Sequence, residues 1–226
     1  MKIAILTGAG ISRESGLATF RDADGLWAGY KIEEVCTPDA LARDPQKVLD
    51  FYNLRRQEVL TVEPNAAHYA LADLEKDHDV TIITQNIDDL HERGGSSNII
   101  HIHGEIFKVR SLTDFECVVE SKQDVNLGDL APDGRQLRPH VCFFGETPYH
   151  WTEAVEAVLD CDLFTVIGTS LQVYPAAGLV DMARGKQIVL IDPHPTRFDF
   201  GVTTIAQPAT IGVPDWVNSL ITKDKS

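Results

Sequence analysis

The sequence is poor in cysteine. Its 226 residues include only Cys36, Cys117, Cys142 and Cys161, and no two of them form a Cys-x-x-Cys pair. This spacing provides neither a disulfide framework nor the paired ligands typical of a structural zinc site. We therefore expect four reduced thiols in a cytoplasmic protein.

Long apolar runs are also missing. No segment approaches the roughly 18 consecutive apolar residues that are typical of a membrane span. The N-terminal segment Lys2–Thr7 is short and leads directly into Gly8. It therefore predicts a first strand rather than a signal peptide.

Basic residues are fewer than acidic ones. Lysine and arginine total 20 and aspartate and glutamate total 34, which gives a formal net charge of −14. This balance disfavours nonspecific binding to nucleic acid or to anionic membranes, although it allows a local basic pocket for a phosphate or a carboxylate. The apolar fraction of 43% is ordinary for a globular chain, and a chain of this length can bury a core without disulfides or metals.

Short apolar runs rich in valine and isoleucine alternate with helical patterns. Runs of this kind are typical of buried parallel strands. They cover Lys2–Thr7, Val80–Thr84, Asn98–His103, Leu163–Gly168, Gln187–Ile191 and Thr203–Ala206. Helical patterns cover Asn65–Lys76, Trp151–Leu159 and Ala176–Arg184. The alternation predicts an α/β fold with a doubly wound parallel Rossmann-like sheet.

Two stretches interrupt this alternation. Residues 31–78 are helical in pattern, and residues 105–139 are polar and irregular, with several glycines and prolines. We expect both stretches to form a smaller inserted second domain. The Rossmann-like domain would then comprise residues 1–30, 79–104 and 140–226.

The first predicted strand leads into Gly8-Ala9-Gly10-Ile11-Ser12. Glycines at this point let the backbone approach a pyrophosphate closely, although a plain strand-to-helix turn explains them too. A third glycine is replaced by Arg13, and the second strand ends in Thr84-Gln85-Asn86 with no ribose-binding acid. The sequence therefore disfavours a hydride-transfer dehydrogenase. Further on, Phe20-Arg21 fits a flap over a nucleotide.

Five ordered motifs resemble those of the sirtuins, the NAD-dependent protein lysine deacylases, and most closely the bacterial CobB-type members. The motifs span most of the chain: Gly8-Ala9-Gly10-Ile11-Ser12 with Gly16 and Phe20-Arg21; Thr84-Gln85-Asn86-Ile87-Asp88-Asp89-Leu90-His91; His103-Gly104; Phe144-Gly145-Glu146; and Gly168-Thr169-Ser170 with Val173 and Pro175. The segment Asp24-Gly25-Leu26-Trp27 adds to the likeness.

The resemblance implies a catalytic role for His103. In the family reaction the acyl-lysine oxygen attacks C1′ of the nicotinamide ribose, nicotinamide leaves, and the histidine deprotonates a ribose hydroxyl so that the acyl group moves to ADP-ribose. A neutral imidazole at a strand end suits this role near pH 7. Asn86 and Asp88 are the other expected catalytic residues. We assign His101, two residues earlier, a structural role.

The resemblance also implies an NAD site. Asp88 can accept a hydrogen bond from a carboxamide, although Asn86 and Asp88 are also ordinary helix caps. Gly168-Thr169-Ser170 is read as the adenosine and phosphate end of the site, or as a tight turn. Asp192 stands where the family usually has asparagine. The expected NAD contacts are Gly8, Ala9, Gly10, Ser12, Phe20, Arg21, Trp27, Gln85, Asn86, Ile87, Asp88, Gly168, Thr169, Ser170, Asp192, Pro193, His194 and Ala209.

Tyr52 and Arg55 share a helix face because they are three residues apart. Together they match the Tyr-x-x-Arg signature of sirtuins that remove succinyl and other dicarboxylic acyl groups, and arginine can bind such a carboxylate as a fork. The alternative is an amphipathic helix with a solvent-reaching arginine. Val141 and Phe144 are expected to line the substrate channel.

The family's structural zinc is not expected here. The stretch that carries two Cys-x-x-Cys pairs in most sirtuins offers only Cys117, with Ser111 near the place of the first family cysteine. We predict no metal. Apolar packing is expected to replace it, through Leu112, Phe115, Val118, Val119, Val125, Leu127 and Leu130.

The sequence thus predicts an NAD-dependent lysine deacylase that removes succinyl, malonyl and acetyl groups from proteins. An ADP-ribosyltransferase or NAD hydrolase is a rival that would use the same pocket. A noncatalytic NAD or ADP-ribose sensor is a second rival, which His103 disfavours. The expected partners are acylated lysine side chains of proteins, and the sequence leaves the oligomeric state open.

Overall fold

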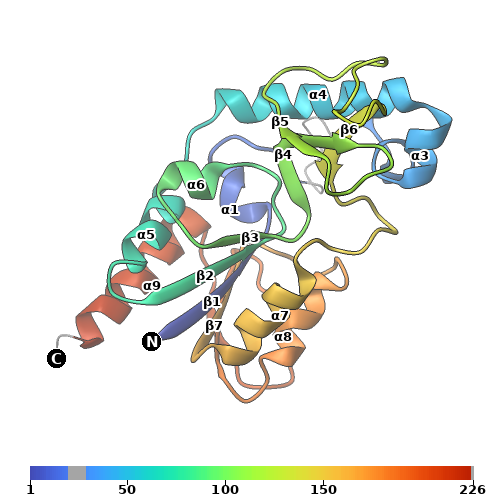
Figure 1. Ribbon diagram of the computed structural model, residues 1–226. Coiled ribbons are helices and arrows are strands. Elements are labelled where there is room, and N and C mark those ends of the chain that lie inside the picture. Colours follow the sequence, from blue (N-terminus) through green and yellow to red (C-terminus); the bar gives the residue numbers. More distant parts are fainter. Residues whose placement is uncertain (20–28, 225–226) are drawn as a thin grey trace.

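The computed structural model describes residues 1–19 and 29–224, and it contains two separate sheets (Figure 1). The larger sheet is parallel and six-stranded, as predicted, in the order β3-β2-β1-β7-β8-β9. Its strands are β1 (Lys2–Thr7), β2 (Asp79–Thr84), β3 (Ile99–His101), β7 (Leu163–Ile167), β8 (Gln187–Ile191) and β9 (Thr203–Ile205).

Side chains of β1 alternate between two hydrophobic cores. Ile3 and Ile5 pack under the helices α5 (Ala66–Leu74) and α9 (Ala209–Asp224), whereas Ala4 and Leu6 pack under α7 (Trp151–Asp160) and α8 (Leu179–Met182). A short 3₁₀ turn, η2 (Ala176–Gly178), precedes α8. Figure 1 shows the two helix pairs on opposite faces of the sheet. This two-faced burial explains why the strands have near-continuous apolar sequences.

Helix α5 begins where its cap was predicted. The Asn65 side chain accepts from the Ala67 amide at 3.0 Å, and its own amide donates to the Ile11 carbonyl at 2.8 Å. One side chain therefore caps α5 and fixes the short helix α1 (Gly10–Arg13). Residues 66–74 were predicted in the smaller domain, but they pack on the larger sheet, because Ala67, Leu71 and Leu74 belong to the core of Ile3 and Ile5.

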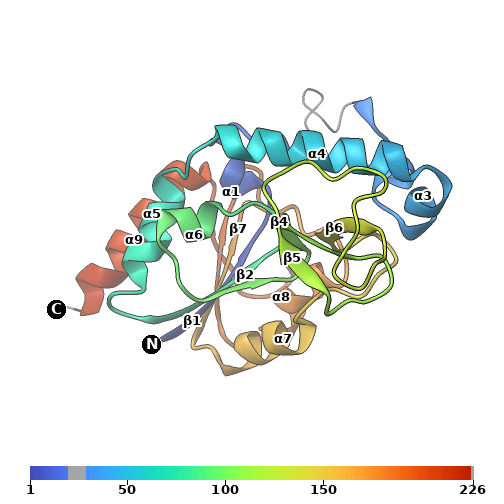
Figure 2. The ribbon, with the colours of Figure 1, turned by 45° about the horizontal axis from the view of Figure 1, so that its top comes forward.

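The smaller sheet is antiparallel, in the order β5-β4-β6, and it packs against a group of helices (Figure 2). Its strands are β4 (Gly104–Ser111), β5 (Val118–Glu120) and β6 (Leu137–Val141), and the helices are α2 (Ile32–Val35), α3 (Pro38–Arg43) and α4 (Pro45–Thr61). Helix α6 (Leu90–Gly94) follows β2. The prediction of an irregular stretch from residue 105 was wrong for β4, because its charged residues conceal the buried positions Ile106 and Val109.

The expected apolar packing of this module was also wrong. Of the seven residues predicted to replace the zinc, only Val125 is buried. The others are 37% to 60% exposed, namely Leu112, Phe115, Val118, Val119, Leu127 and Leu130. Polar contacts hold the module instead. The Ser111 hydroxyl donates to Asp133 at 2.6 Å and accepts from two turn amides.

An ionic contact closes the other end of this module. The Arg138 guanidinium lies 3.9 Å from the centroid of the Phe143 ring and donates to both carboxylate oxygens of Glu146, at 2.7 and 3.2 Å. Glu146 also accepts from the Phe143 amide at 2.8 Å. Because Arg138 is 3% exposed, the pair is shielded from water and its charges are well satisfied.

Two neutral histidines are buried beside β1 and β2. The ring centroids of His68 and His91 are 5.1 Å apart, and both residues are at most 1% exposed. Burial lowers the pKa of His68 to about 4 and lowers that of His91 as well. His91 Nε2 donates to Thr7 Oγ1, whose own proton goes to Thr84 Oγ1 at 2.8 Å. In the described part of the chain, no helix is long and apolar enough to span a membrane.

These histidines predict acid sensitivity. Their folded-state pKa values lie below the ordinary 6.5, so the unfolded chain binds protons more readily once the pH falls below 6.5. Between pH 6.5 and 4 the free energy of unfolding therefore decreases, by up to about 1.4 kcal/mol per pH unit for each histidine. Urea unfolding at a series of pH values measures this slope. If a His68→Gln variant shows the same change of unfolding free energy with pH, His68 is not a source of the acid sensitivity.

Candidate active site

The order of strands reverses between β1 and β7, and ligands of open α/β sheets bind at such a point. Here the backbones of the two following loops touch. Gly8 N donates to Ile167 O at 3.1 Å, and Gly10 N donates to Gly168 O at 2.8 Å. A Cβ on Gly10 would lie 2.7 Å from the Gly168 backbone. The glycines are therefore required for this close contact between the two loops.

Three sequence motifs meet at this edge. Gln85 Nε2 donates to Thr169 Oγ1 at 3.2 Å, which joins the loop after β2 to the loop after β7. Asn86 Nδ2 donates to Ser12 Oγ at 3.1 Å, which joins it to α1. The predicted residues Gly8, Gly10, Ser12, Gln85, Asn86, Gly168 and Thr169 are thus brought together. Ala9 lies between the two glycines and is the residue before α1, and Ser170 follows Thr169.

Asp88 is buried next to this group. It is 4% exposed, and its Oδ1 accepts from the Leu90 amide at 3.2 Å, as a helix-capping side chain does. Burial raises the pKa of Asp88, while the Leu90 amide, the Ser12 hydroxyl and the charge of Arg55 act in the opposite direction. The neighbouring Ile87 carbonyl accepts from the Ile106 amide at 2.7 Å and so ties this loop to β4.

His103 is held in one tautomer. Its Nδ1 lies 3.1 Å from the Gln85 carbonyl, which can only accept, so Nδ1 carries the proton. Nε2 then keeps a lone pair that can take a proton. Burial lowers the pKa of His103, and the hydrogen bond to Gln85 opposes that shift. At neutral pH the ring is therefore an uncharged base.

His101 differs in charge. Its Nδ1 donates to the Asn86 carbonyl at 3.2 Å and its Nε2 donates to Glu92 at 2.7 Å. Burial acts to lower the pKa of His101, but the hydrogen bond and charge of Glu92, the charge of Glu105 and the Asn86 carbonyl together outweigh burial and raise that pKa. With both ring nitrogens donating, His101 supports the Asn86 loop and is not available as a base.

Metal ligands are few in the described residues. Glu92, His101 and Glu105 have ligand atoms within 4.8 Å of one another. His101 already bonds Glu92, and Glu105 pairs with Lys108 at 2.7 Å. Cys117 has no such partners among the described side chains, and Ser111 is committed to Asp133. The smaller module therefore does not fit a tetrahedral zinc.

Tyr52 and Arg55 bond to different partners. The Tyr52 hydroxyl donates to Cys36 Sγ at 3.2 Å, and its ring stacks on that of Phe143. Arg55 Nη1 pairs with Glu58 at 3.0 Å. The structure thus places the two side chains on one buried helix face but does not join their polar ends.

The two predicted channel residues also differ from each other. Val141 is 4% exposed and belongs to the core cluster of the smaller module, whereas Phe144 is 39% exposed. The Phe144 amide donates to the Cys36 carbonyl at 3.0 Å. Phe144 is therefore free to contact a ligand, whereas Val141 is packed in the core.

The remaining predicted contacts are spread along the sheet edge. Asp192 follows β8, and its Oδ1 accepts from the His194 amide at 2.8 Å, so the carboxylate shapes the turn through Pro193. Ala209 is buried as the first residue of α9. Phe20, Arg21 and Trp27 lie outside the described residues.

Sequence reasoning missed several supporting residues. Thr7 and Thr84 hold the ends of β1 and β2 together, and Thr84 Oγ1 also accepts from the Asn86 amide at 3.0 Å. Threonines at two adjacent strand ends are a signal that could have been used. Arg138 gave no signal, because its partners Phe143 and Glu146 meet it only in the folded chain.

The fold and the site define an α/β nucleotide-binding protein with a smaller module beside its glycine loops. The sequence profile of the Sir2 family matches residues 8–175. The chain therefore belongs to the Sir2 family.

Relatives and solved structures agree over nearly the whole chain. An NAD-dependent protein deacylase of Bacteroides thetaiotaomicron is 47% identical and covers 97% of both chains. One of Aggregatibacter actinomycetemcomitans is 53% identical over 84% of this chain and 92% of its own. A Sir2 homologue solved with NAD has a TM-score of 0.88 and 37% identity, and covers 98% of this chain and 90% of its own.

A Gly10→Ala substitution tests the glycine contact. The added Cβ must displace the Gly168 backbone, so we expect a loss of about 2 kcal/mol of stability and weaker NAD binding. Thermal unfolding and calorimetric titration with NAD measure the two effects. Gly201→Ala is the matched control, because no atom lies within 4 Å of its Cβ. Equal behaviour of the two variants would count against the close approach.

Proposed function

We propose that this chain is an NAD-dependent protein-lysine deacylase. The observation that carries the proposal is His103, which presents an unprotonated Nε2 at the sheet edge where the glycine loops meet. The deacylases of Bacteroides thetaiotaomicron and Aggregatibacter actinomycetemcomitans support it, because they match 97% and 84% of this chain at 47% and 53% identity.

The residues at this edge fit NAD. A side chain on Gly8 or Gly10 would clash with the loop of Gly168 and Thr169. Because both residues are glycines, the backbone is uncovered and can lie against a pyrophosphate. Asp88 can accept from the carboxamide of the nicotinamide, and Asn86 and Ser12 can bond ribose hydroxyls. When bound, NAD supplies the ADP-ribose that receives the acyl group and the nicotinamide that leaves.

His103 is the general base of this proposal. Its Nε2 takes the proton of a ribose hydroxyl, which activates that oxygen for acyl transfer. The Gln85 carbonyl accepts from Nδ1 and so stabilises the positive ring that results. Because the His103 carbonyl accepts from the Cys142 amide at 2.9 Å, the base is also connected to the segment that carries Phe144.

A His103→Ala variant should bind NAD with little change and lose at least about a hundredfold in deacylation rate, which is typical for removal of a general base. Mass spectrometry of an acetyl-lysine peptide measures turnover, and calorimetry measures NAD binding.

The matched control for this variant is His150→Asn, because His150 is an exposed residue with a φ of 50° that asparagine tolerates. Full turnover by His103→Ala would refute the assignment. NAD consumption with an unchanged peptide in the unmodified chain would favour ADP-ribosyl transfer or NAD hydrolysis.

We further propose that the acyl groups include succinyl and malonyl. Arg55 is buried, carries a positive charge, pairs with the partly exposed Glu58 and donates to the Ala18 carbonyl at 3.5 Å. An acyl carboxylate can replace Glu58 as its partner. Tyr52 lies one helical turn away, and its hydroxyl can turn from the weak acceptor Cys36 Sγ to the same carboxylate.

An Arg55→Met substitution tests the acyl specificity. Loss of a charge-assisted hydrogen bond should lower kcat/KM for succinyl-lysine roughly 10- to 100-fold and leave that for acetyl-lysine nearly unchanged. Arg43→Met is the control, because Arg43 lies on α3 and donates to the Glu33 carbonyl. A parallel loss for both acyl groups would assign Arg55 to packing rather than to carboxylate binding.

The cytoplasmic location expected from the sequence also remains a proposal. It is supported by the four cysteines, all of which are free thiols in the fold. The proposed partners are proteins that carry acylated lysines. The negative net charge of this chain would attract basic, lysine-rich proteins.

A further inference from the structure

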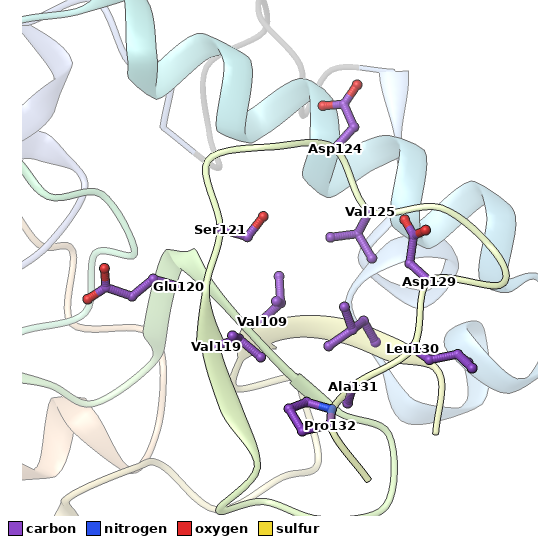
Figure 3. A pocket seen from close by; sticks show the side chains of 11 residues that line it. Val109, Val119, Glu120, Ser121, Asp124, Val125, Asp129, Leu130, Ala131 and Pro132 are labelled. Atoms are coloured by element: carbon purple, nitrogen blue, oxygen red, sulfur yellow. The ribbon is translucent and has the colours of Figure 1, made fainter. Parts of the chain in front are cut away.

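The smaller sheet bears a cavity of about 410 Å³ that none of the candidate active-site residues lines. Its walls come from β4, β5, β6 and the loop between β5 and β6 (Figure 3). Val109 and Val125 form a buried floor, at 1% and 2% exposure. A hollow of this size accommodates a side chain or a small ligand.

The walls of this cavity are apolar although they are open to water. Leu130 is 60% exposed and Val119 is 38% exposed, and both line the cavity together with Ala131 and Pro132. Large apolar side chains that surround a hollow and remain exposed are typical of a binding surface.

The rim of the cavity is acidic. Glu120, Asp124 and Asp129 are lining residues, and no lysine or arginine is among them. Figure 3 shows Glu120 and Asp124 on different sides of the cavity, with their carboxylates directed away from its centre. These three carboxylates are not arranged as metal ligands, because the metal-competent cluster among the described residues is Glu92, His101 and Glu105.

Two cationic groups lie near the rim but do not cover it. The Arg56 side chain is completely buried, and its guanidinium bonds the Ile106 carbonyl and Asn53. Lys122 Nζ lies 5.3 Å from the centroid of the Phe107 ring.

Within the chain, Asp124 Oδ1 accepts from the Gln57 side chain at 3.1 Å and Asp129 Oδ2 accepts from the Asn126 amide at 2.7 Å. Both donors are uncharged, so the rim keeps its negative charge for a cationic ligand.

The cavity is already formed in the free chain. The Asn53 side chain bonds both the carbonyl and the amide of Val125 at 2.9 Å. The Gln136 side chain accepts from Gly128 N and donates to Asn126 O. Since these contacts fix the loop, a ligand would not have to order it, which favours binding.

We propose that this cavity docks a segment of the protein substrate in which an apolar side chain is flanked by lysine or arginine. The apolar side chain fills the hollow, and the basic side chains reach Glu120 and Asp124. The inference rests on the proposed function, because that function provides a lysine-bearing partner. A second copy of this chain is a poor occupant, since two chains of net charge −14 repel one another.

The test uses a fluorescent peptide without lysine, so that it cannot be a deacylation substrate, with leucine between arginines. Fluorescence anisotropy measures its binding to the full chain and to the double variant Glu120→Gln, Asp124→Asn. The double variant should bind about tenfold more weakly, as expected for the loss of two exposed ion pairs. Binding to the unmodified chain should weaken as salt is raised.

The matched control is the double variant Asp114→Asn, Glu116→Gln, which removes the same charge from the turn before β5. A Leu130→Ser variant tests the apolar wall and should also bind more weakly. Equal binding by the two double variants, or equal binding of a peptide with leucine between glutamines, would overturn the proposal.

Turnover of a short acetyl-lysine peptide separates this inference from the proposed function. The Glu120→Gln, Asp124→Asn variant should deacylate it at the unmodified rate. A second peptide carries the same acetyl-lysine sequence joined by a flexible linker to the leucine–arginine segment. With the unmodified chain its KM should be several-fold lower than that of the short peptide, and with the double variant the two KM values should be equal. Absence of turnover with the unmodified chain and with the double variant would refute the proposed function. An equal KM of the unmodified chain for both peptides would refute docking.

Discussion

Contact between the backbones of Gly10 and Gly168 determines the geometry of the sheet edge. The two residues follow β1 and β7, the strands between which the order reverses, and each would clash with the other if it carried a side chain. Their hydrogen bond joins the two loops, and the side-chain bonds from Gln85 to Thr169 and from Asn86 to Ser12 connect the loop after β2 to the same two loops. A nucleotide can therefore meet backbone at this point rather than side chains.

The second requirement is a rigid connection between the two sheets. Ile87 O accepts from Ile106 N, and His103 O accepts from Cys142 N, so the loops that carry the candidate catalytic residues are bonded to β4 and to the segment after β6. The pair of Arg138 and Glu146 then fixes that segment against Phe143. In this arrangement the proposed base His103 and the proposed acyl-binding helix α4, whose Arg56 donates to the Ile106 carbonyl of β4, are parts of one hydrogen-bonded framework.

Local sequence patterns were sufficient to predict the features that neighbouring residues determine. The six parallel strands, the cap at Asn65 and the glycine loops follow from hydrophobic runs and turn chemistry. Contacts between distant residues were not predictable in this way. The packing of the smaller module decides that Leu112 and Leu130 are exposed. It also decides that the Tyr52 hydroxyl meets Cys36. The strand β4 was missed because its charged side chains conceal the buried positions Ile106 and Val109, and because Arg110 meets Glu146 only in the folded chain.

The most direct measurement is the identification of every product formed from an acyl-lysine peptide and NAD. Mass spectrometry with the unmodified chain should find deacylated peptide, nicotinamide and acylated ADP-ribose in equimolar amounts, and none of them without NAD. Free ADP-ribose with an unchanged peptide would contradict the account. Acyl loss that proceeds without NAD would contradict it equally.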